Sequence, residues 1–217
     1  QDGVPGGRYV RNVASSENVA VVSDPLSSVS AEPGKWLARD FFKAERIRTL
    51  TVAGAGDMQW KITRDEEWGQ WKFAAGGGEL DASAAVGAVN ALGNLAFTDV
   101  VVDAAPQDGD RPLTVTAETF DRLTYTLNIT GVGKDSHRLT FTVSGEPPAQ
   151  RVAEKGEKPE DKEKRDKAFA EDRKKLEERI AREKALGKWT YVVEAKALAP
   201  LLRERARLVA PRQAQQR

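Results

Sequence analysis

The sequence has no cysteine, a single histidine, a single methionine and no long hydrophobic run. Without cysteine, thiol catalysis, cysteine-ligated zinc and disulfide frameworks are all excluded. One histidine, His137, also excludes metal sites built from several histidines. No stretch approaches the roughly 20 apolar residues that a membrane-spanning helix needs. The sequence therefore predicts a domain that folds around a hydrophobic core and uses no cofactor.

The chain also lacks a dominant charge. Lys and Arg number 34 and Asp and Glu number 33, so the formal net charge is +1. No overall electrostatic field attracts the protein to nucleic acid or anionic lipid, and we do not expect nucleic acid as a partner. Hydrophobic residues make up 40% of the 217 residues, which is enough for a self-sufficient core.

Alternation of apolar and polar residues is the main structural signal. It is clearest in residues 113–119, 123–129 and 139–143, and it is typical of half-buried antiparallel strands. Further strands are predicted at residues 8–13, 18–22, 47–52, 58–62, 71–73, 97–102 and 189–193. The predicted fold class is α+β: antiparallel β-sheet with short helices packed on one face, plus one long charged helix inserted near the C-terminal end.

Four helical segments are indicated. Pro33 can open a short helix over residues 33–41, and Asp81 is the expected N-cap of a helix that reaches residue 96. A short helix that holds Leu198, Leu201 and Leu202 is expected after the last strand. Residues 158–184 are almost continuously charged, and acidic residues precede basic ones by four positions at Glu160–Lys164, Asp161–Arg165, Glu163–Lys167, Glu171–Lys175 and Glu178–Arg182. Such pairs stabilise an exposed helix by about 0.3–0.5 kcal/mol each.

The large apolar residues of this charged helix are Phe169, Leu176 and Ile180. They cover less than the three or four heptads that indicate a coiled coil, so they are expected to dock one stretch of the helix on the body. Two functions of the helix stay open. It is either a solvated spacer or an arm that binds a partner through these three residues.

The predicted domain organisation has four parts. Residues 1–16 form an N-terminal strand or linker, residues 17–145 and 188–209 form the α+β body, residues 146–187 form a charged helical insertion, and residues 210–217 form a frayed tail. The body could also consist of two similar lobes that meet near residue 104.

Isolated motifs do not assemble into a catalytic site in the sequence. His137 is expected at a turn-to-strand junction, as an ordinary surface or strand-end histidine. Asp108 and Asp110 flank Gly109 but lack EF-hand spacing, so a turn is the preferred interpretation over a calcium site. Gly76, Gly77 and Gly78 precede a helix without a P-loop or dinucleotide fingerprint. We therefore expect no catalytic residues, no metal ligands and no enzyme activity.

Three aromatic residues suggest a second hypothesis for the function, in which the domain has a ligand pocket. Trp60 and Trp71 lie in neighbouring predicted strands, and Tyr125 lies in a third. Side chains at alternating positions of paired strands meet on one face, where these rings either build the core or line a ligand pocket. The second hypothesis is a small-ligand carrier or sensor that binds through Trp60, Trp71 and Tyr125.

Several segments resemble a bacterial family known as domain of unknown function 4340. The resemblance covers residues 17–209 and consists of fold-forming patterns in a matching order: ENVAVV, KWLARDFF, IRTLTV, MQWKITRD and WGQWKF, then LTYTLNITG, LTFTVSG and KWTYVVEAKALAPLL. In that family, the strand at residues 139–144 would connect directly to the strand at Trp189. Residues 146–187 therefore look like an insertion.

The resemblance implies a location, and it implies no functional residues. Members of the family are expected outside the cytoplasm, in the periplasm or on the outer face of the cytoplasmic membrane, with an N-terminal anchor or signal that would precede Gln1. Some are associated with ABC-transport or gliding-type machinery. The expected protein is a non-catalytic structural or protein-interaction module of a bacterial cell envelope, whose partner is another envelope or membrane protein.

Overall fold

The computed structural model describes residues 7–11, 19–24, 26, 29–30, 32–54, 59–101, 112–132, 134–153 and 156–211. The chain divides into two compact units, Gln1–Ala38 and Arg39–Arg217. Residues 17–38, which the sequence analysis assigns to the body, thus belong to the first unit. Three predicted features lie outside the described residues: the turn at Asp108 and Asp110, the lobe boundary near residue 104 and most of the C-terminal tail.

The first unit contains the two predicted strands as an antiparallel pair, β1 (Arg8–Arg11) and β2 (Val19–Val22). The helix predicted over residues 33–41 is wrong in length. It is a single 3₁₀ turn, η1 (Pro33–Trp36), and the backbone of Leu37 is already extended. Gly34 lies within this turn and disfavours helix propagation, and Trp36 instead donates its indole N–H to the carbonyl of Ser30 at 2.7 Å.

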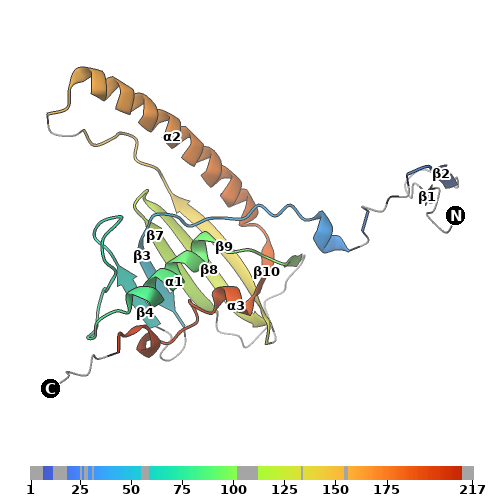
Figure 1. Ribbon diagram of the computed structural model, residues 1–217, viewed down its shortest axis with the longest axis horizontal. Helices are drawn as coiled ribbons and strands as arrows, with labels where there is room; N and C mark the ends of the chain where they lie inside the picture. The colour runs from blue at the N-terminus through green and yellow to red at the C-terminus, as the bar shows by residue number, and fades with distance from the viewer. Residues whose placement is uncertain are drawn as a thin grey trace, which may run out of the picture. The chain divides into compact units, whose positions relative to one another are not determined.

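The second unit is built on one eight-stranded sheet in the order β5-β4-β3-β7-β8-β9-β10-β6, and every strand pair is antiparallel (Figure 1). The strands are β3 (Ile47–Ala53), β4 (Gln59–Thr63), β5 (Lys72–Phe73), β6 (Asp99–Val101), β7 (Leu113–Thr119), β8 (Leu123–Val132), β9 (Ser136–Gly145) and β10 (Thr190–Glu194). The predicted α+β class is confirmed. Since a single sheet contains strands from both halves of the body, the halves do not form separate sheets.

The strands have a buried inner face and an outer face. Alternate residues of β7, β8 and β9 are buried, and the register places Ala117 opposite Tyr125 and Leu127 opposite Phe141 on the inner face. Side-chain alternation in a pleated strand explains this pattern. The period-two signal in the sequence was therefore sufficient to predict both the strands and their buried positions.

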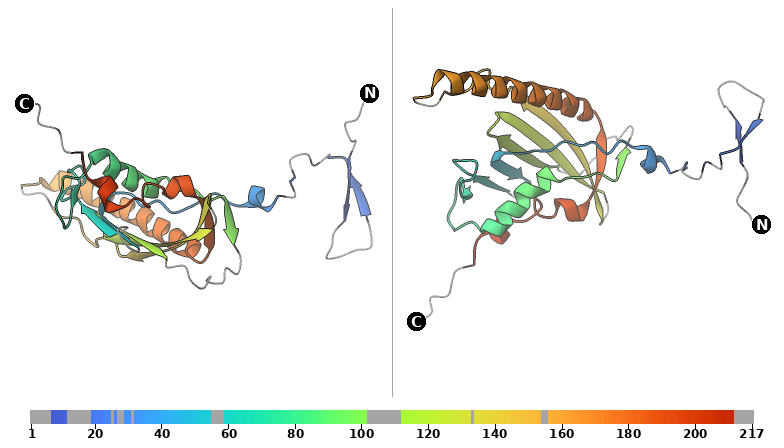
Figure 2. Two further views of the ribbon diagram at one scale, coloured as in Figure 1. Left: turned by 90° about the horizontal axis from the view of Figure 1, so that it is seen from below. Right: turned by 45° about the horizontal axis from the view of Figure 1, so that its top comes forward.

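Short helices cover the inner face. These are α1 (Ala82–Gly93) and α3 (Ala195–Leu198), which lie on the same side of the sheet in Figures 1 and 2, followed by the 3₁₀ turn η2 (Arg205–Leu208). Asp81 caps α1 as predicted, because its carboxylate accepts a hydrogen bond from the backbone N–H of Ala84 at 2.9 Å. The buried face of α1 consists of Ala84, Ala85, Ala88 and Leu92.

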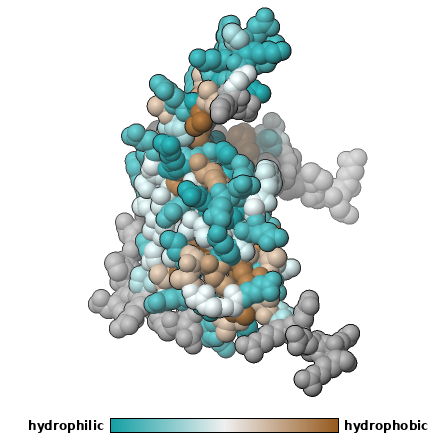
Figure 3. Space-filling view, turned by 90° about the vertical axis from the view of Figure 1, so that its left-hand side faces the viewer, coloured by the Kyte–Doolittle hydropathy of each residue, from teal (hydrophilic) through white to brown (hydrophobic). Residues whose placement is uncertain are grey.

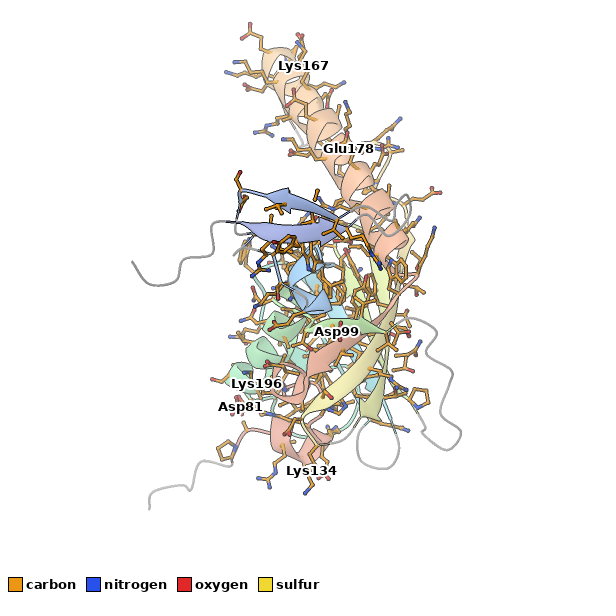
Figure 4. All side chains as sticks on the ribbon, turned by 90° about the vertical axis from the view of Figure 1, so that its right-hand side faces the viewer. Asp81, Asp99, Lys134, Lys167, Glu178 and Lys196 are labelled. Carbon is orange, nitrogen blue, oxygen red and sulfur yellow. The ribbon has the colours of Figure 1, made fainter. Side chains whose placement is uncertain are left out.

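The predicted charged helix is α2 (Pro159–Leu186), which Gly187 terminates. Of its 28 residues, only Ile180 and Glu183 are buried, and both lie in the last two turns. Figure 4 shows Lys167 and Glu178 on the part of α2 that extends beyond the sheet. The helix is therefore attached to the body at its C-terminal end. No helix in the described part of the chain has the length and apolar content needed to cross a bilayer.

Aromatic rings fill the core near the attachment of α2. Six rings from five different segments pack with centroid separations of 4.4–5.9 Å, and they belong to Phe41, Phe42, Phe97, Tyr125, Phe141 and Tyr191. Tilted and edge-to-face pairs of this kind add about 0.5–1.5 kcal/mol each beyond their buried area. The segment before β3 is thereby fixed against the sheet.

Candidate functional site

The structure places the three predicted pocket residues in different environments. Trp60 is 4% exposed, and its indole N–H donates to the carbonyl of Arg203 at 2.9 Å. Tyr125 is fully buried in the aromatic core. Trp71 is half-buried and lines a surface groove that neither of the other two lines. In the described part of the chain the three rings do not share one pocket.

The three apolar residues of α2 also differ in their surroundings. Ile180 is buried against the body, whereas Phe169 and Leu176 are half-buried on the wall of a groove of about 590 Å³. Phe120, Pro147 and Pro148 contribute to the lining of this groove. Part of the predicted seam therefore docks the helix, and part of it faces an open space.

His137 lies on β9, within a strand and half-buried. Its register partners are Gly131 on β8 and Val193 on β10, so its neighbours across the sheet are apolar.

The glycine run before α1 is bonded within the chain. The carbonyl oxygen of Gly77 accepts a hydrogen bond from the Arg205 guanidinium at 2.6 Å. Among the described residues, no three His, Asp or Glu side chains gather in a way that could hold a metal ion.

Arg46 lines the same surface groove as Trp71. Its guanidinium donates to both carboxylate oxygens of Glu67 at 2.8 Å each, and it also pairs with Asp121. The hydrogen bonds to Glu67 raise the pKa of Arg46, and the same contact lowers the pKa of Glu67. Bidentate pairing fixes the plane of the guanidinium. Arg46 thereby ties the β4–β5 loop to the start of β3.

Arg46 also adopts a left-handed backbone conformation, with φ of 52°. Such a conformation is uncommon for residues other than glycine and persists where surrounding contacts fix it. The backbone carbonyl of Arg46 accepts a hydrogen bond from Phe120 N–H at 2.9 Å. The backbone and side chain of this one residue therefore contact two other segments, the β4–β5 loop and the turn between β7 and β8.

Arg64 also lines this groove. Its guanidinium carbon lies 4.8 Å from the centre of the Trp71 ring and 5.6 Å from the centre of the Phe120 ring. The same side chain donates to the carbonyls of Ile47, at 2.8 Å, and Glu67. A planar cation stacked between aromatic rings and bonded to backbone carbonyls orients Trp71 firmly.

These contacts frame a groove of about 330 Å³, here called the tryptophan groove. It lies between the β4–β5 loop and the outward side of α1, and its lining comprises Ala44, Glu45, Arg46, Ile47, Arg64, Glu67, Trp68, Trp71, Val86, Val89, Asn90 and Gly93. Trp68 is 92% exposed, and Val86 is 47% exposed. In Figure 3, which looks at the left-hand side of Figure 1, apolar surface gathers below a band of hydrophilic side chains.

A buried carboxylate seats α2 on the body. Glu183 is 1% exposed; its Oε2 accepts from the Tyr125 hydroxyl at 2.8 Å, and its Oε1 accepts from the Lys43 backbone N–H at 3.2 Å. Burial, and then the negative charge of Glu183, raise the pKa of Tyr125, so this hydroxyl remains a donor. Arg179, which lies one helical turn before Glu183 on α2, pairs with Glu45 at 2.7 Å.

Further bonds hold the end of α2. The Tyr191 hydroxyl donates to the carbonyl of Leu186 at 2.8 Å. A side chain at Gly187 would collide with the backbone, because its Cβ would lie 2.8 Å from the carbonyl oxygen of Phe141. The last turns of α2 are thus firmly fixed, and the helix continues from them as a single unbroken element.

No protein family model, curated protein sequence or solved structure matches this chain. The resemblance to domain of unknown function 4340 accordingly stays a prediction.

Sequence reasoning missed three residues that organise these sites: Trp68, Arg46 and Glu183. Trp68 lies in a turn of mixed composition, and nothing in the sequence distinguishes it from buried Trp60 or half-buried Trp71. Glu183 is one of many acidic residues on a charged helix. Its spacing of three from Ile180 was the available signal, since residues three apart share a helix face.

Proposed function

We propose that this protein is a non-catalytic interaction module, and that the tryptophan groove binds an uncharged apolar segment of a partner protein. The observation that carries the proposal is the almost complete exposure of Trp68 in a groove that the exposed Val86 also lines. Large exposed apolar groups that adjoin one another mark interaction sites, and tryptophan is enriched among the residues that contribute most binding energy.

The chemistry of the partner segment follows from the charges at the groove. Arg46 is paired with Glu67 and Asp121, and Glu45 is paired with Arg179. Arg64 is engaged with backbone carbonyls and the Trp71 ring. Because these charges are satisfied within the chain, a charged ligand would have to displace existing pairs. An apolar side chain gains contact with the indole rings and Val86 without that cost.

The setting of this interaction is part of the same proposal. The segment patterns that resemble domain of unknown function 4340 support a bacterial cell-envelope protein, located in the periplasm or on the outer face of the cytoplasmic membrane. They also support an auxiliary role in a transport or gliding-type complex. The partner would then be another envelope or membrane protein, and membrane association would come through an N-terminal anchor.

A second candidate function is a small-ligand carrier or sensor. The observation in its favour is the position of Trp71, which lines the tryptophan groove with Arg64 stacked on its ring. The groove volume of about 330 Å³ lies at the lower end of the range for small-molecule sites. A small ligand would be buried by Trp71 at the base of the groove and would not require the exposed Trp68.

Selection of binding peptides separates the two candidates. A displayed library of random peptides is selected on the immobilised protein, with counter-selection on the Trp68→Ala/Val86→Asp variant. We expect enriched peptides rich in large apolar residues, whose affinity falls at least tenfold in that variant. Trp189→Ala is the matched control, because Trp189 is also exposed but does not line the groove, and it should leave the affinity unchanged.

Two results would refute the proposal. The first is that peptides bind the Trp68→Ala/Val86→Asp variant as tightly as the native chain, or that no peptide is enriched. The second is robust turnover in a broad hydrolase screen that disappears when one groove residue is changed, since that result would identify an enzyme.

A further inference from the structure

The outer face of the eight-stranded sheet concentrates almost all of the threonine in the chain. Strand register places eleven of the thirteen threonines on this face: Thr49, Thr51, Thr63, Thr114, Thr116, Thr124, Thr126, Thr130, Thr140, Thr142 and Thr190. Thr51, Thr116, Thr126 and Thr142 stand directly opposite one another on four adjacent strands. The face is thus a regular array of hydroxyl and methyl groups.

This face is poor in charge. Charged residues make up 31% of the chain, yet on β3, β7, β8 and β9 the outward positions in register carry two charged side chains, Glu118 and Arg138. High β propensity accounts for the choice of threonine, but it does not account for the near absence of charge, since pairs of opposite charge also stabilise neighbouring strands on a face in water. Depletion of charge at the centre of a surface is characteristic of the core of a protein interface.

The charged residues of this face lie mostly toward its borders. Lys61 and Lys72 belong to β4 and β5 at one edge of the sheet, and Asp99 and Glu194 belong to β6 and β10 at the other. An uncharged centre with a charged border is the usual anatomy of an interface. The helices α1 and α3 lie on the inner face, so they do not cover this array (Figure 2).

The dimensions of the face match those of a specific interface. The eight strands contain 49 residues, and each residue covers about 3.3 Å along its strand and about 4.8 Å across the sheet, which gives about 800 Å². A standard interface buries about 800 Å² per partner. The outer face of one subunit is therefore large enough to support a stable dimer.

We infer that two copies of this chain associate through their outer faces to form a two-fold symmetric dimer. A hydroxyl group both donates and accepts hydrogen bonds, so a threonine array is complementary to a second copy of itself. A face rich in one charge would repel its copy, and this face has no such excess. Two sheets packed in this way keep their strand directions within about 30°.

Sedimentation velocity of the full chain tests the inference. We expect the native chain to sediment with twice its mass of 23.7 kDa at micromolar concentrations. Thr126→Lys/Thr142→Lys, which puts two charges near the centre of the face, should sediment as a monomer. The control Ser83→Lys/Ala170→Lys adds the same charge on exposed positions of α1 and α2 and should remain a dimer.

A second measurement does not depend on how well the lysine variant folds. Because the chain has no cysteine, Thr126→Cys and Ser83→Cys each give a single reactive thiol. Maleimide labelling of Thr126→Cys should be several-fold slower in concentrated than in dilute protein, while labelling of Ser83→Cys should not change. A native chain that stays monomeric at high concentration, or a dimer in which both Thr126 variants behave like their controls, would overturn the inference.

Discussion

At the scale of single residues, Glu183 decides where the long helix meets the body. A buried carboxylate is costly unless its oxygens are satisfied. Here the donors are the hydroxyl of Tyr125 and the backbone N–H of Lys43, which come from the sheet and from the segment before it. One side chain therefore connects three parts of the fold.

Substitution of Glu183 should destabilise the protein more than its place on a charged helix suggests. Glu183→Ala leaves the Tyr125 hydroxyl and the Lys43 N–H without an acceptor, so we expect a loss of about 2–4 kcal/mol. Glu183→Gln keeps an acceptor and should cost about half as much. Urea unfolding monitored by circular dichroism measures both changes, with Glu178→Ala as the exposed control on the same helix. Equal stability of Glu183→Ala and Glu178→Ala would refute this role.

At the scale of elements, the sequence predicted what depends on local pattern. Strands β7, β8 and β9 follow from alternation, and α1 follows from its Asp81 cap. The prediction of a helix at residues 33–41 was wrong, because the spacing of aromatic residues cannot reveal that the backbone becomes extended at Leu37. On α2, the predicted pair Glu163–Lys167 is formed, at 3.0 Å.

The candidate site was less accessible to sequence reasoning than the fold. Trp60, Trp71 and Trp68 have the same chemistry, yet one is buried, one is half-buried and one is exposed. What distinguishes them is the path of the β4–β5 loop, which Arg46 and Arg64 fix through contacts with distant segments. Such contacts leave no periodic signal in the sequence.

Removal of the helical insertion tests whether α2 is an addition to the body. Replacing residues 146–187 with a short turn should leave a cooperatively folding protein, because Ile180 and Glu183 are its buried residues. In that deletion variant the Tyr125 hydroxyl and the Lys43 N–H would be exposed to water and would bond to it. The loss of Glu183 should therefore cost less folding free energy in the deletion variant than in Glu183→Ala. Thermal unfolding followed by calorimetry measures this. Loss of a cooperative transition would show that the helix is required for folding.

At the scale of the whole second unit, two surfaces have different chemistry. The tryptophan groove combines exposed indole and valine side chains with charges that are already paired. The outer sheet face presents neutral hydroxyl groups in register. The two inferences are therefore independent, since changes at Trp68 should leave the oligomeric state unaltered and changes at Thr126 should leave peptide affinity unaltered.

The central claim is that partners bind at the tryptophan groove, and tryptophan indole resonances test it most directly. The chain has five tryptophans, so its ¹H–¹⁵N spectrum should contain five indole signals. On addition of a selected peptide, we predict that the Trp68 and Trp71 signals shift while those of buried Trp60 and exposed Trp189 do not. A shift of Trp60, or unchanged Trp68 and Trp71 signals in the presence of bound peptide, would contradict the account.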